Sequence, residues 1–211
     1  NKKNQIISTK TEDNGATIVE ILNQNNKSER NSVNLSISKI FFPIQTTIKL
    51  KSYYSNIKNN MLFNDELLIN TTNSWVNNLN LSSDFADWIT AEYDGSLTLS
   101  SIKNKVQNTQ KTRQQVNKIG LYFYFLGNHT LNFSGEWISS KLGKNSRSDL
   151  FGDFMYRFTL SEKRKIDIEF SMINIFNKDT YQDFSVDNYT VTESYFYLRP
   201  RQLYVTLRFP L

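Results

Sequence analysis

The sequence predicts an all-β fold, an antiparallel up-and-down transmembrane β-barrel with about ten strands in this chain. The first observation is alternation. Leu203, Val205, Leu207 and Phe209 fall at every second position of the last segment, so they share one face of an extended strand. The second is length, since several segments continue for about 12 residues or more, against ~5–6 in globular strands. The third is that short and long polar connections alternate along the chain, as periplasmic turns and extracellular loops do.

The alternation alone leaves two architectures open. Segments 166–172 and 202–211 each have one apolar face and one face with charged residues. That pattern suits a sandwich strand with a wet side and equally a barrel strand between lipid and lumen. A sandwich has no reason to place short turns at one end and long loops at the other, so the sorting of the connections favours the barrel.

The composition is typical of a membrane barrel and excludes several other classes. Hydrophobic residues make up 38% and aromatic residues 14%, which suits large side chains facing outward in bands. There is no cysteine, which excludes a disulfide or thiolate metal site, and we expect no cofactor. The longest apolar run, residues 119–126, is far shorter than the ~20 residues of a membrane helix. The net charge of +5 is spread along the chain, without the basic stripe of a nucleic-acid-binding protein.

The N-terminal part predicts a hairpin followed by long strands. Residues 5–10 form a strand end before Asp13-Asn14-Gly15, and Asn-Gly is the strongest short hairpin signal. We interpret this tip as an outer one, with residues 16–40 as one interrupted descending strand; the alternative adds a hairpin and inverts the first strand. Phe42-Pro43 ends the strand, because proline cannot donate to a sheet ladder. Residues 44–51 start the next strand.

Further strands and connections follow in the same alternation. Short connections are expected at Ser82-Ser83-Asp84, Gly127-Asn128 and Ser161-Glu162, where turn-forming residues interrupt the pattern. Long polar tips are expected near residues 59–65, 103–113, 141–148 and 178–190. The strands between them are expected to cover 67–81, 89–99, 119–125, 131–137, 154–160, 166–172 and 202–211.

The two strand faces predict which side chains meet lipid and which line a lumen. Bulky apolar residues occupy one face and are expected to contact lipid. They are Leu121, Phe123, Phe133, Phe154, Phe158, Phe170, Leu203, Val205, Leu207 and Phe209. On the opposite face, ionisable and phenolic residues are expected to line the lumen and hold a plug by hydrogen bonds and ion pairs. They are Arg157, Asp167, Glu169, Tyr204 and Arg208.

Other reactive or aromatic residues receive ordinary interpretations. His129, the single histidine, is expected in solvent at a tight turn, since no cysteine or second histidine exists to complete a metal site. Carboxylates such as Glu92 and Glu136 are expected to belong to a polar lumen wall rather than to acid–base catalysis. Aromatic residues are expected to form interfacial girdles, among them Trp75, Trp137, Tyr195, Phe196 and Tyr197.

Cations gather at the expected outer tips. They are Lys103, Lys105, Lys111, Arg113, Lys141, Lys144 and Arg147. Two interpretations remain open: a solvated loop face, or a site for lipopolysaccharide phosphates, which pair with ammonium and guanidinium groups.

Two short motifs near the C-terminus resemble a known family. Asn174-Ile175-Phe176-Asn177 is followed, after a loop, by Leu198-Arg199-Pro200-Arg201 and the terminal strand. In this order, with the turn at residues 38–43, they resemble the C-terminal barrel part of a TonB-dependent outer-membrane receptor. The type is the one with a carboxypeptidase-regulatory-like domain and a plug upstream. The resemblance implies that the first motif lies in the penultimate strand and that the whole barrel has about 22 strands. One departure is Pro210-Leu211 at the end, where the family usually has an aromatic residue.

The resemblance also implies a function. Residues 1–211 would be the C-terminal portion of an outer-membrane barrel whose plug and N-terminal half lie outside the chain. The chain would form the wall of a receptor that imports a nutrient ligand across the bacterial outer membrane, and it would not be an enzyme. Its partners would be outer-membrane lipid and lipopolysaccharide, the remaining barrel half and plug, and TonB through that plug. The alternatives are an autonomous small outer-membrane barrel acting as an adhesin or enzyme, and a soluble lectin-like β-sandwich.

Overall fold

The structure, a computed structural model, describes residues 6–11, 17–22, 28–105, 109–161, 163, 166–186 and 191–209. Apart from one short 3-10 helix, the regular elements of these residues are all strands. In chain order they are β1 (Ile6–Thr11), β2 (Thr17–Leu22), β3 (Glu29–Phe41), the helix η1 (Phe42–Ile44), β4 (Thr46–Phe63), β5 (Glu66–Ala86), β6 (Ile89–Lys103), β7 (Gln110–Phe125), β8 (His129–Leu142), β9 (Asn145–Ser161), β10 (Ile166–Ile173), β11 (Thr180–Val186), β12 (Val191–Tyr197) and β13 (Gln202–Arg208). Within the described ranges, no helix is long and apolar enough to cross a membrane.

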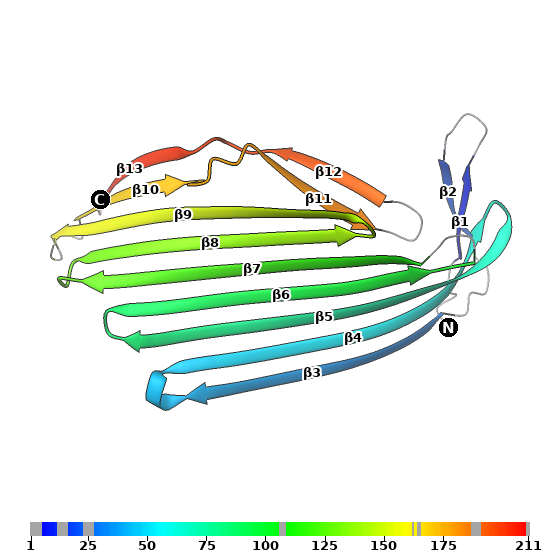
Figure 1. The fold of residues 1–211 in the computed structure, drawn as a ribbon, viewed down its shortest axis with the longest axis horizontal. Coiled ribbons are helices and arrows are strands. Elements are labelled where there is room, and N and C mark those ends of the chain that lie inside the picture. Colours follow the sequence, from blue (N-terminus) through cyan, green and yellow to red (C-terminus); the bar gives the residue numbers. More distant parts are fainter. Residues whose placement is uncertain are drawn as a thin grey trace.

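Nine strands form an antiparallel up-and-down sheet (Figure 1). From β3 to β10 each strand pairs antiparallel with its neighbours in sequence, and β13 then pairs with the other side of β10. The described strands do not close into a barrel, because β3 and β13 lie at opposite edges of the sheet. The predicted all-β, antiparallel up-and-down arrangement is confirmed in this open form.

The connections alternate between the two ends of this sheet, as predicted. One end, called the turn end here, holds the connections β3–β4, β5–β6, β7–β8 and β9–β10 (Figure 1). The other, called the tip end, holds β4–β5, β6–β7, β8–β9 and the hairpin of β11 and β12. The turn near Pro43 and the tip at 141–148 therefore lie at opposite ends, as the alternation of connections predicts.

Several predicted connections are displaced because polar residues continue the strands. The strand β5 runs through Ser82-Ser83-Asp84 to Ala86, since Ser82 and Ser83 pair with Thr47 and Thr46 of β4. At the tip end, β4 continues through residues 59–60 to a two-residue turn at Asn64-Asp65, where both φ angles are positive, 48° and 63°. Positive φ at both positions is what a type I′ hairpin turn requires.

The expected difference in loop length is therefore wrong for the tips β4–β5 and β8–β9, which are two-residue turns, and the tip between β6 and β7 is shorter than expected. Residues 141–148 were expected as a long tip, yet β8 and β9 pair from Leu142↔Asn145 onward around Gly143-Lys144 alone. Between β6 and β7 the strand pairing already begins at Gln110, within the expected tip 103–113. Ladder hydrogen bonds join backbone groups, so a polar segment opposite another strand can extend the sheet.

The N-terminal strands form a separate hairpin at the tip end. β1 pairs with β2 from Ile6↔Leu22 to Thr11↔Thr17, and it pairs in parallel with the end of β4 through Ser8↔Leu62 and Thr9↔Phe63. The interpretation of residues 16–40 as one interrupted strand is wrong, because β2 pairs with β1 while β3 lies in the nine-stranded sheet. The alternative, with an added hairpin and an inverted first strand, agrees with the structure only in the added hairpin, because β1 runs parallel to β4. The expected tip at Asp13-Asn14-Gly15 lies outside the described residues.

The burial of side chains is the reverse of that in a globular protein. Among the described residues only Met61 and Leu68 are buried apolar side chains. Buried polar residues are more numerous: Ser55, Asn70, Ser83, Ser140, Glu169 and Gln182. Large apolar side chains are instead exposed, with Leu203 at 72% and Val205 at 71%. Soluble monomers rarely expose large continuous apolar patches.

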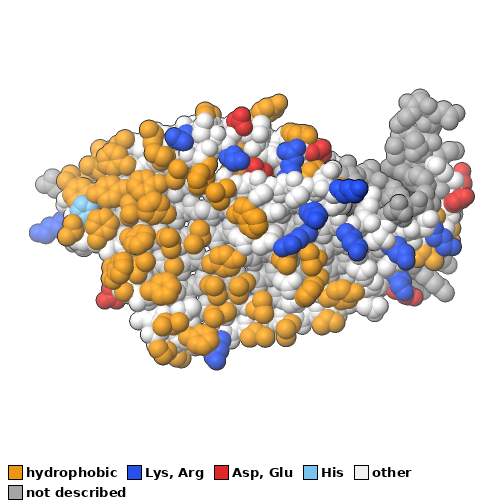
Figure 2. Space-filling model, in the orientation of Figure 1, with side chains coloured by type: hydrophobic (Ala, Val, Ile, Leu, Met, Phe, Trp, Pro, Cys, Tyr) orange, Lys and Arg blue, Asp and Glu red, His pale blue; other side chains and the backbone are white. Residues whose placement is uncertain are grey.

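The strand registers sort the side chains into two faces. Directly opposite residues of antiparallel strands lie on the same face. The pairs Leu121↔Phe133, Phe133↔Phe154, Tyr156↔Phe170 and Phe170↔Val205 therefore place residues of β7 to β10 and of β13 on one side of the sheet. This side is called the apolar face here. It holds all the strand residues expected to meet lipid, and Phe209 follows β13 with 58% exposure. In Figure 2, hydrophobic side chains cover the part of this face near the turn end, and Lys and Arg gather toward the tip end.

Candidate functional site

A buried carboxylate on the opposite face, called the polar face here, joins two arginines from neighbouring strands. Glu169 of β10 is directly opposite Arg157 of β9, and its Oε2 lies 3.0 Å from Arg157 Nη2 and 3.1 Å from Arg208 Nη2. Arg157 Nε also donates to Oε2 at 3.2 Å, and Arg208 Nη2 to Oε1 at 3.3 Å. Glu169 is only 7% exposed. The strands β9, β10 and β13 are therefore joined by an ion-pair cluster.

The other residues expected on the lumen side lie on the same face but outside this cluster. Asp167 accepts a hydrogen bond from Thr159 Oγ1 at 2.8 Å. Tyr204 donates to Gln202 Oε1 at 2.6 Å and is 41% exposed. The structure thus brings together Arg157, Glu169 and Arg208, places Asp167 directly opposite Arg208, and leaves Tyr204 exposed.

The first family-like motif forms a compact connection after β10. Asn174 and Asn177 have positive φ angles of 57° and 51°, a conformation that asparagine tolerates better than most residues. The Asn174 side chain accepts from the Lys178 amide at 2.9 Å and donates to the carbonyls of Lys178 at 2.7 Å and Arg199 at 2.9 Å. The resemblance implied that this motif lies in the penultimate strand, and that expectation is wrong. The motif follows the strand, because these asparagines turn the backbone out of the ladder.

The second motif binds directly to the first. The amide of Arg201 donates to Asn177 Oδ1 at 2.9 Å, and the Arg201 guanidinium donates to the Ile175 carbonyl. With the contact from Asn174 to Arg199, these bonds fix the start of β13 against the end of β10. We call the segments Asn174–Asn177 and Leu198–Arg201 together the motif junction. Its hydrogen bonds set the register in which Arg208 reaches Glu169.

The motif junction also packs against β9. The Ile175 amide donates to the Gly152 carbonyl at 2.8 Å, and the Asn174 amide donates to Asp153 Oδ1 at 2.8 Å. A Cβ atom at Gly152 would lie 2.8 Å from Phe176 Cε2. Gly152 is therefore the position over which the aromatic ring of the motif fits, a requirement that the sequence alone did not indicate.

The hairpin of β11 and β12 lies against the polar face near the tip end. Tyr181 contacts Phe151 of β9 edge-on at 6.0 Å and stacks on Phe196 at 5.9 Å between ring centroids. Lys178 Nζ lies 3.5 Å from Asp149 Oδ1, and Arg147 Nη2 lies 3.9 Å from Glu193 Oε1. The region 178–190 was expected as a loop, and its strand pairing was missed.

Burial is the main influence on the pKa of one side chain in this hairpin, Tyr181. It raises the pKa of the Tyr181 phenol, and the nearby carboxylates of Asp183, Asp149 and Glu136 raise that pKa further. The side chain of Gln182, 4% exposed, has neither amide atom hydrogen-bonded within the described structure. The hairpin therefore covers part of the polar face without satisfying all of its own polar groups.

His129 belongs to an aromatic cluster on the apolar face. Its ring stacks on Phe158 at 4.7 Å and on Phe125 at 5.2 Å, and Nδ1 lies 2.6 Å from Tyr156 Oη. The expectation of a solvated turn residue is wrong, because the strand begins at His129 and places its ring between aromatic neighbours. In the described ranges, no group of three or more His, Cys, Asp or Glu side chains is placed to hold a metal ion.

Comparison with other proteins adds no relative to this description. The sequence matches no family model, and no curated protein or solved structure gave a significant match.

Proposed function

We propose that this chain forms part of the wall of an outer-membrane β-barrel, as the C-terminal barrel portion of a TonB-dependent receptor that imports a nutrient. The observation that supports it most is the reversed burial. Glu169 is 7% exposed on the polar face, whereas Leu203 and Val205 on the apolar face are more than 70% exposed. A barrel wall requires this pattern, because hydrocarbon surrounds it and polar groups line its interior.

The dimensions of the apolar face support the membrane assignment. On β8, the apolar face runs from His129 to Trp137, eight residue steps that span ~26 Å at the usual rise of a strand. The lipid-facing band of outer-membrane barrels is about 25 Å tall between two aromatic girdles. Aromatic side chains lie at both limits of this band on β8: His129, with Phe125 and Phe158 beside it, toward the turn end, and Trp137 toward the tip end.

The motif junction and the open sheet support the receptor type. The two motifs that resemble the family are held together by three hydrogen bonds, which join Asn174 to Arg199 and both Ile175 and Asn177 to Arg201. The sheet has two edges, which a membrane-spanning sheet must pair with further strands. Additional strands and a plug, contributed by other parts of the receptor, would complete the barrel and fill a lumen lined by Arg157, Glu169 and Arg208.

Lipid contact of the apolar face tests the membrane assignment. Single cysteines at Phe133 and Ser134, neighbours on opposite faces of β8, would carry an environment-sensitive fluorophore in the full receptor in bilayers. We expect quenching by lipids brominated on the acyl chain at position 133 and little quenching at 134. Equal quenching at the two positions would overturn the proposal.

Energised uptake tests the receptor assignment separately. Cells expressing the full protein would be given labelled iron chelates, cobalamin, oligosaccharides and peptides, with and without a functional TonB. We expect uptake of one class that disappears without TonB. Uptake that does not depend on TonB would exclude this receptor type, while the proposal of a barrel wall in the membrane would still stand.

A further inference from the structure

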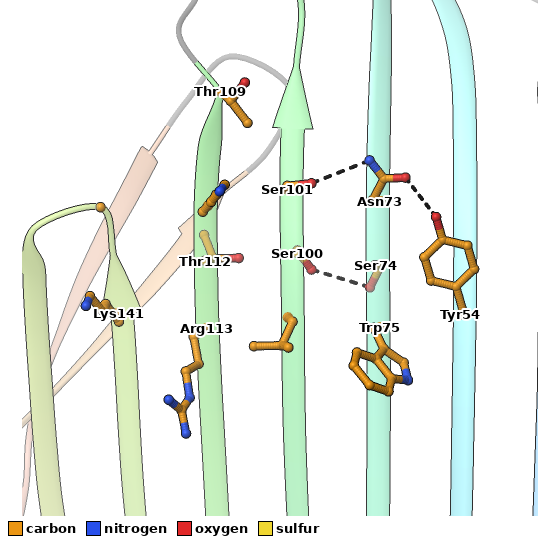
Figure 3. Close-up of a pocket in the computed structure, with 13 residues that line it drawn as sticks. Tyr54, Asn73, Ser74, Trp75, Ser100, Ser101, Thr109, Thr112, Arg113 and Lys141 are labelled. Atoms are coloured by element: carbon orange, nitrogen blue, oxygen red, sulfur yellow. Dashed lines mark hydrogen bonds between the residues drawn. The ribbon is translucent and has the colours of Figure 1, made fainter.

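A groove of about 620 Å³ lies on the apolar face at the tip-end limit of the apolar band. Its lining includes Tyr54, Trp75, Leu99, Lys111, Arg113 and Lys141 (Figure 3). Five of these form one row across β4 to β8, through the direct pairs Tyr54↔Trp75, Trp75↔Leu99, Leu99↔Arg113 and Arg113↔Lys141. Aromatic and aliphatic side chains thus lead directly into two cations at one level of the sheet.

Among the described residues, the cations of this groove have no carboxylate partner. Arg113 and Lys141 lie directly opposite each other, and directly opposed like charges destabilise a sheet. The ion pairs among the described residues do not involve Lys111, Arg113 or Lys141, and Arg113 Nη2 donates to the neutral Gln115 at 2.9 Å. A bound anion would remove the repulsion.

The distribution of carboxylates explains why the anion has to come from outside the chain. The strand registers place the Asp and Glu residues of β5 to β9 on the polar face. They are Glu66, Asp84, Glu92, Asp94, Glu136, Asp149 and Asp153. The basic cluster of Lys111, Arg113 and Lys141 therefore faces outward without acidic neighbours on its own side of these strands.

The wall of the groove opposite the cations is neutral. Tyr54 Oη donates to Asn73 Oδ1 at 3.1 Å, and Asn73 Nδ2 donates to Ser101 Oγ at 3.5 Å (Figure 3). The indole N–H of Trp75 donates to Ser52 at 2.8 Å. The groove therefore offers an amphipathic molecule a cationic side, an apolar floor at Leu99 and the ring of Trp75.

We propose that this groove binds the phosphate of an anionic membrane lipid, with the acyl chains lying along the apolar face. Arg113 pairs with two phosphate oxygens, as a guanidinium does with phosphate geometry, and Lys141 and Lys111 supply further charge. Tyr and Trp are enriched at the level where lipid headgroups meet hydrocarbon, which is the level of Tyr54 and Trp75 in this row. The inference rests on the proposed membrane location.

The structure divides the tip cations that the sequence had grouped together. Arg147 lies across from Ser140 on the polar face and is near Glu193, so it is not part of the groove. Lys144 belongs to the two-residue turn between β8 and β9. The site therefore consists of the cluster at Lys111, Arg113 and Lys141, not of the tips as a whole.

Retention of lipid A tests the proposal on the full receptor. Barrels would be loaded with lipid A in mixed micelles, exchanged into lipid-free detergent, and analysed by mass spectrometry for lipid retained per protein. We expect the double variant Arg113→Gln/Lys141→Gln to retain about tenfold less, because two charge-assisted contacts are lost. The control Lys49→Gln/Lys51→Gln removes two cations from the polar face of β4 and should retain lipid A as the unmodified receptor does.

Three further comparisons identify the source of the phosphate and control for misfolding of the double variant. Dephosphorylated lipid A should be retained as poorly as the double variant retains lipid A, and millimolar inorganic phosphate should not displace the lipid. Arg113→Lys, which keeps the charge, should retain most of it. Equal retention by the double variant and the unmodified receptor, displacement by inorganic phosphate, or equal binding of the dephosphorylated lipid would each overturn the inference. If position 133 shows no lipid contact, the membrane proposal itself fails.

Discussion

Glu169 Oε2 lies 3.0 Å from Arg157 Nη2 and 3.1 Å from Arg208 Nη2, so one buried carboxylate joins β9, β10 and β13. Replacing Glu169 by Gln should lower the free energy of unfolding by about 1–3 kcal/mol, because two guanidinium groups lose a common anionic partner. Denaturant titration of the refolded protein measures the change. Glu193→Gln is the control, since the Arg147–Glu193 contact of 3.9 Å is largely exposed and worth ~0–1 kcal/mol. Equal effects of the two variants would contradict a special role for Glu169.

The two faces of β10 should differ in their tolerance of charge. Phe170 is 46% exposed on the apolar face, and its neighbour Ser171 lies on the polar face. Phe170→Arg should cost about 2–4 kcal/mol near the middle of the membrane, whereas Ser171→Arg should be nearly neutral. Refolding into bilayers with denaturant titration measures both variants. A similar cost for the two would show that the apolar face does not meet hydrocarbon.

The contact between Gly152 and Phe176 should behave as a coupled pair. Gly152→Ala should destabilise the barrel by about 1–3 kcal/mol, because the added methyl group overlaps the aromatic ring. Adding Phe176→Leu should recover part of that loss, and a double-mutant cycle on the free energy of unfolding should give a coupling of about 0.5–3 kcal/mol. Purely additive effects would mean that the ring does not occupy the space above Gly152.

Alternation in the sequence was sufficient to predict the main sheet. The positions of Phe133, Phe154, Phe170 and Val205 follow from a period of two, and their pairing follows once neighbouring strands are antiparallel. Strand ends were less predictable. Ser82 and Ser83 look like turn residues, but they pair with Thr47 and Thr46, and side-chain polarity does not prevent a backbone ladder from continuing.

The candidate sites depend on distances between residues of different strands, which the alternation of residues in the sequence does not give. Arg157, Glu169 and Arg208 could be placed on one face from the sequence, but their grouping depends on the register that the motif junction sets between β10 and β13. The row from Tyr54 to Lys141 crosses five consecutive strands, so its residues are far apart in sequence. The hairpin of β11 and β12 was missed because its segment had been assigned to a long polar tip.

The open edges lead to the last prediction, that residues 1–211 alone will not form a closed monomeric barrel. The edge strands β3 and β13 leave unpaired backbone groups, and each such group costs several kcal/mol in hydrocarbon. Closing so few strands would nearly fill the interior with side chains. The hairpin of β11 and β12, which already lies against the polar face, would have to fit into the same space. β1 does not relieve the edge at β13, because it pairs with β4.

The test uses refolding in detergent and a cysteine cross-link. The isolated chain should give no heat-modifiable monomer on electrophoresis, and cysteines at Val33 of β3 and Val205 of β13 should not cross-link within it. In the proposed receptor, a cysteine at Val205 should cross-link to a strand outside residues 1–211, since the edge of β13 needs a partner there. A heat-modifiable monomer whose β13 pairs with β3 or with residues 4–11 would contradict this prediction and favour an autonomous small barrel.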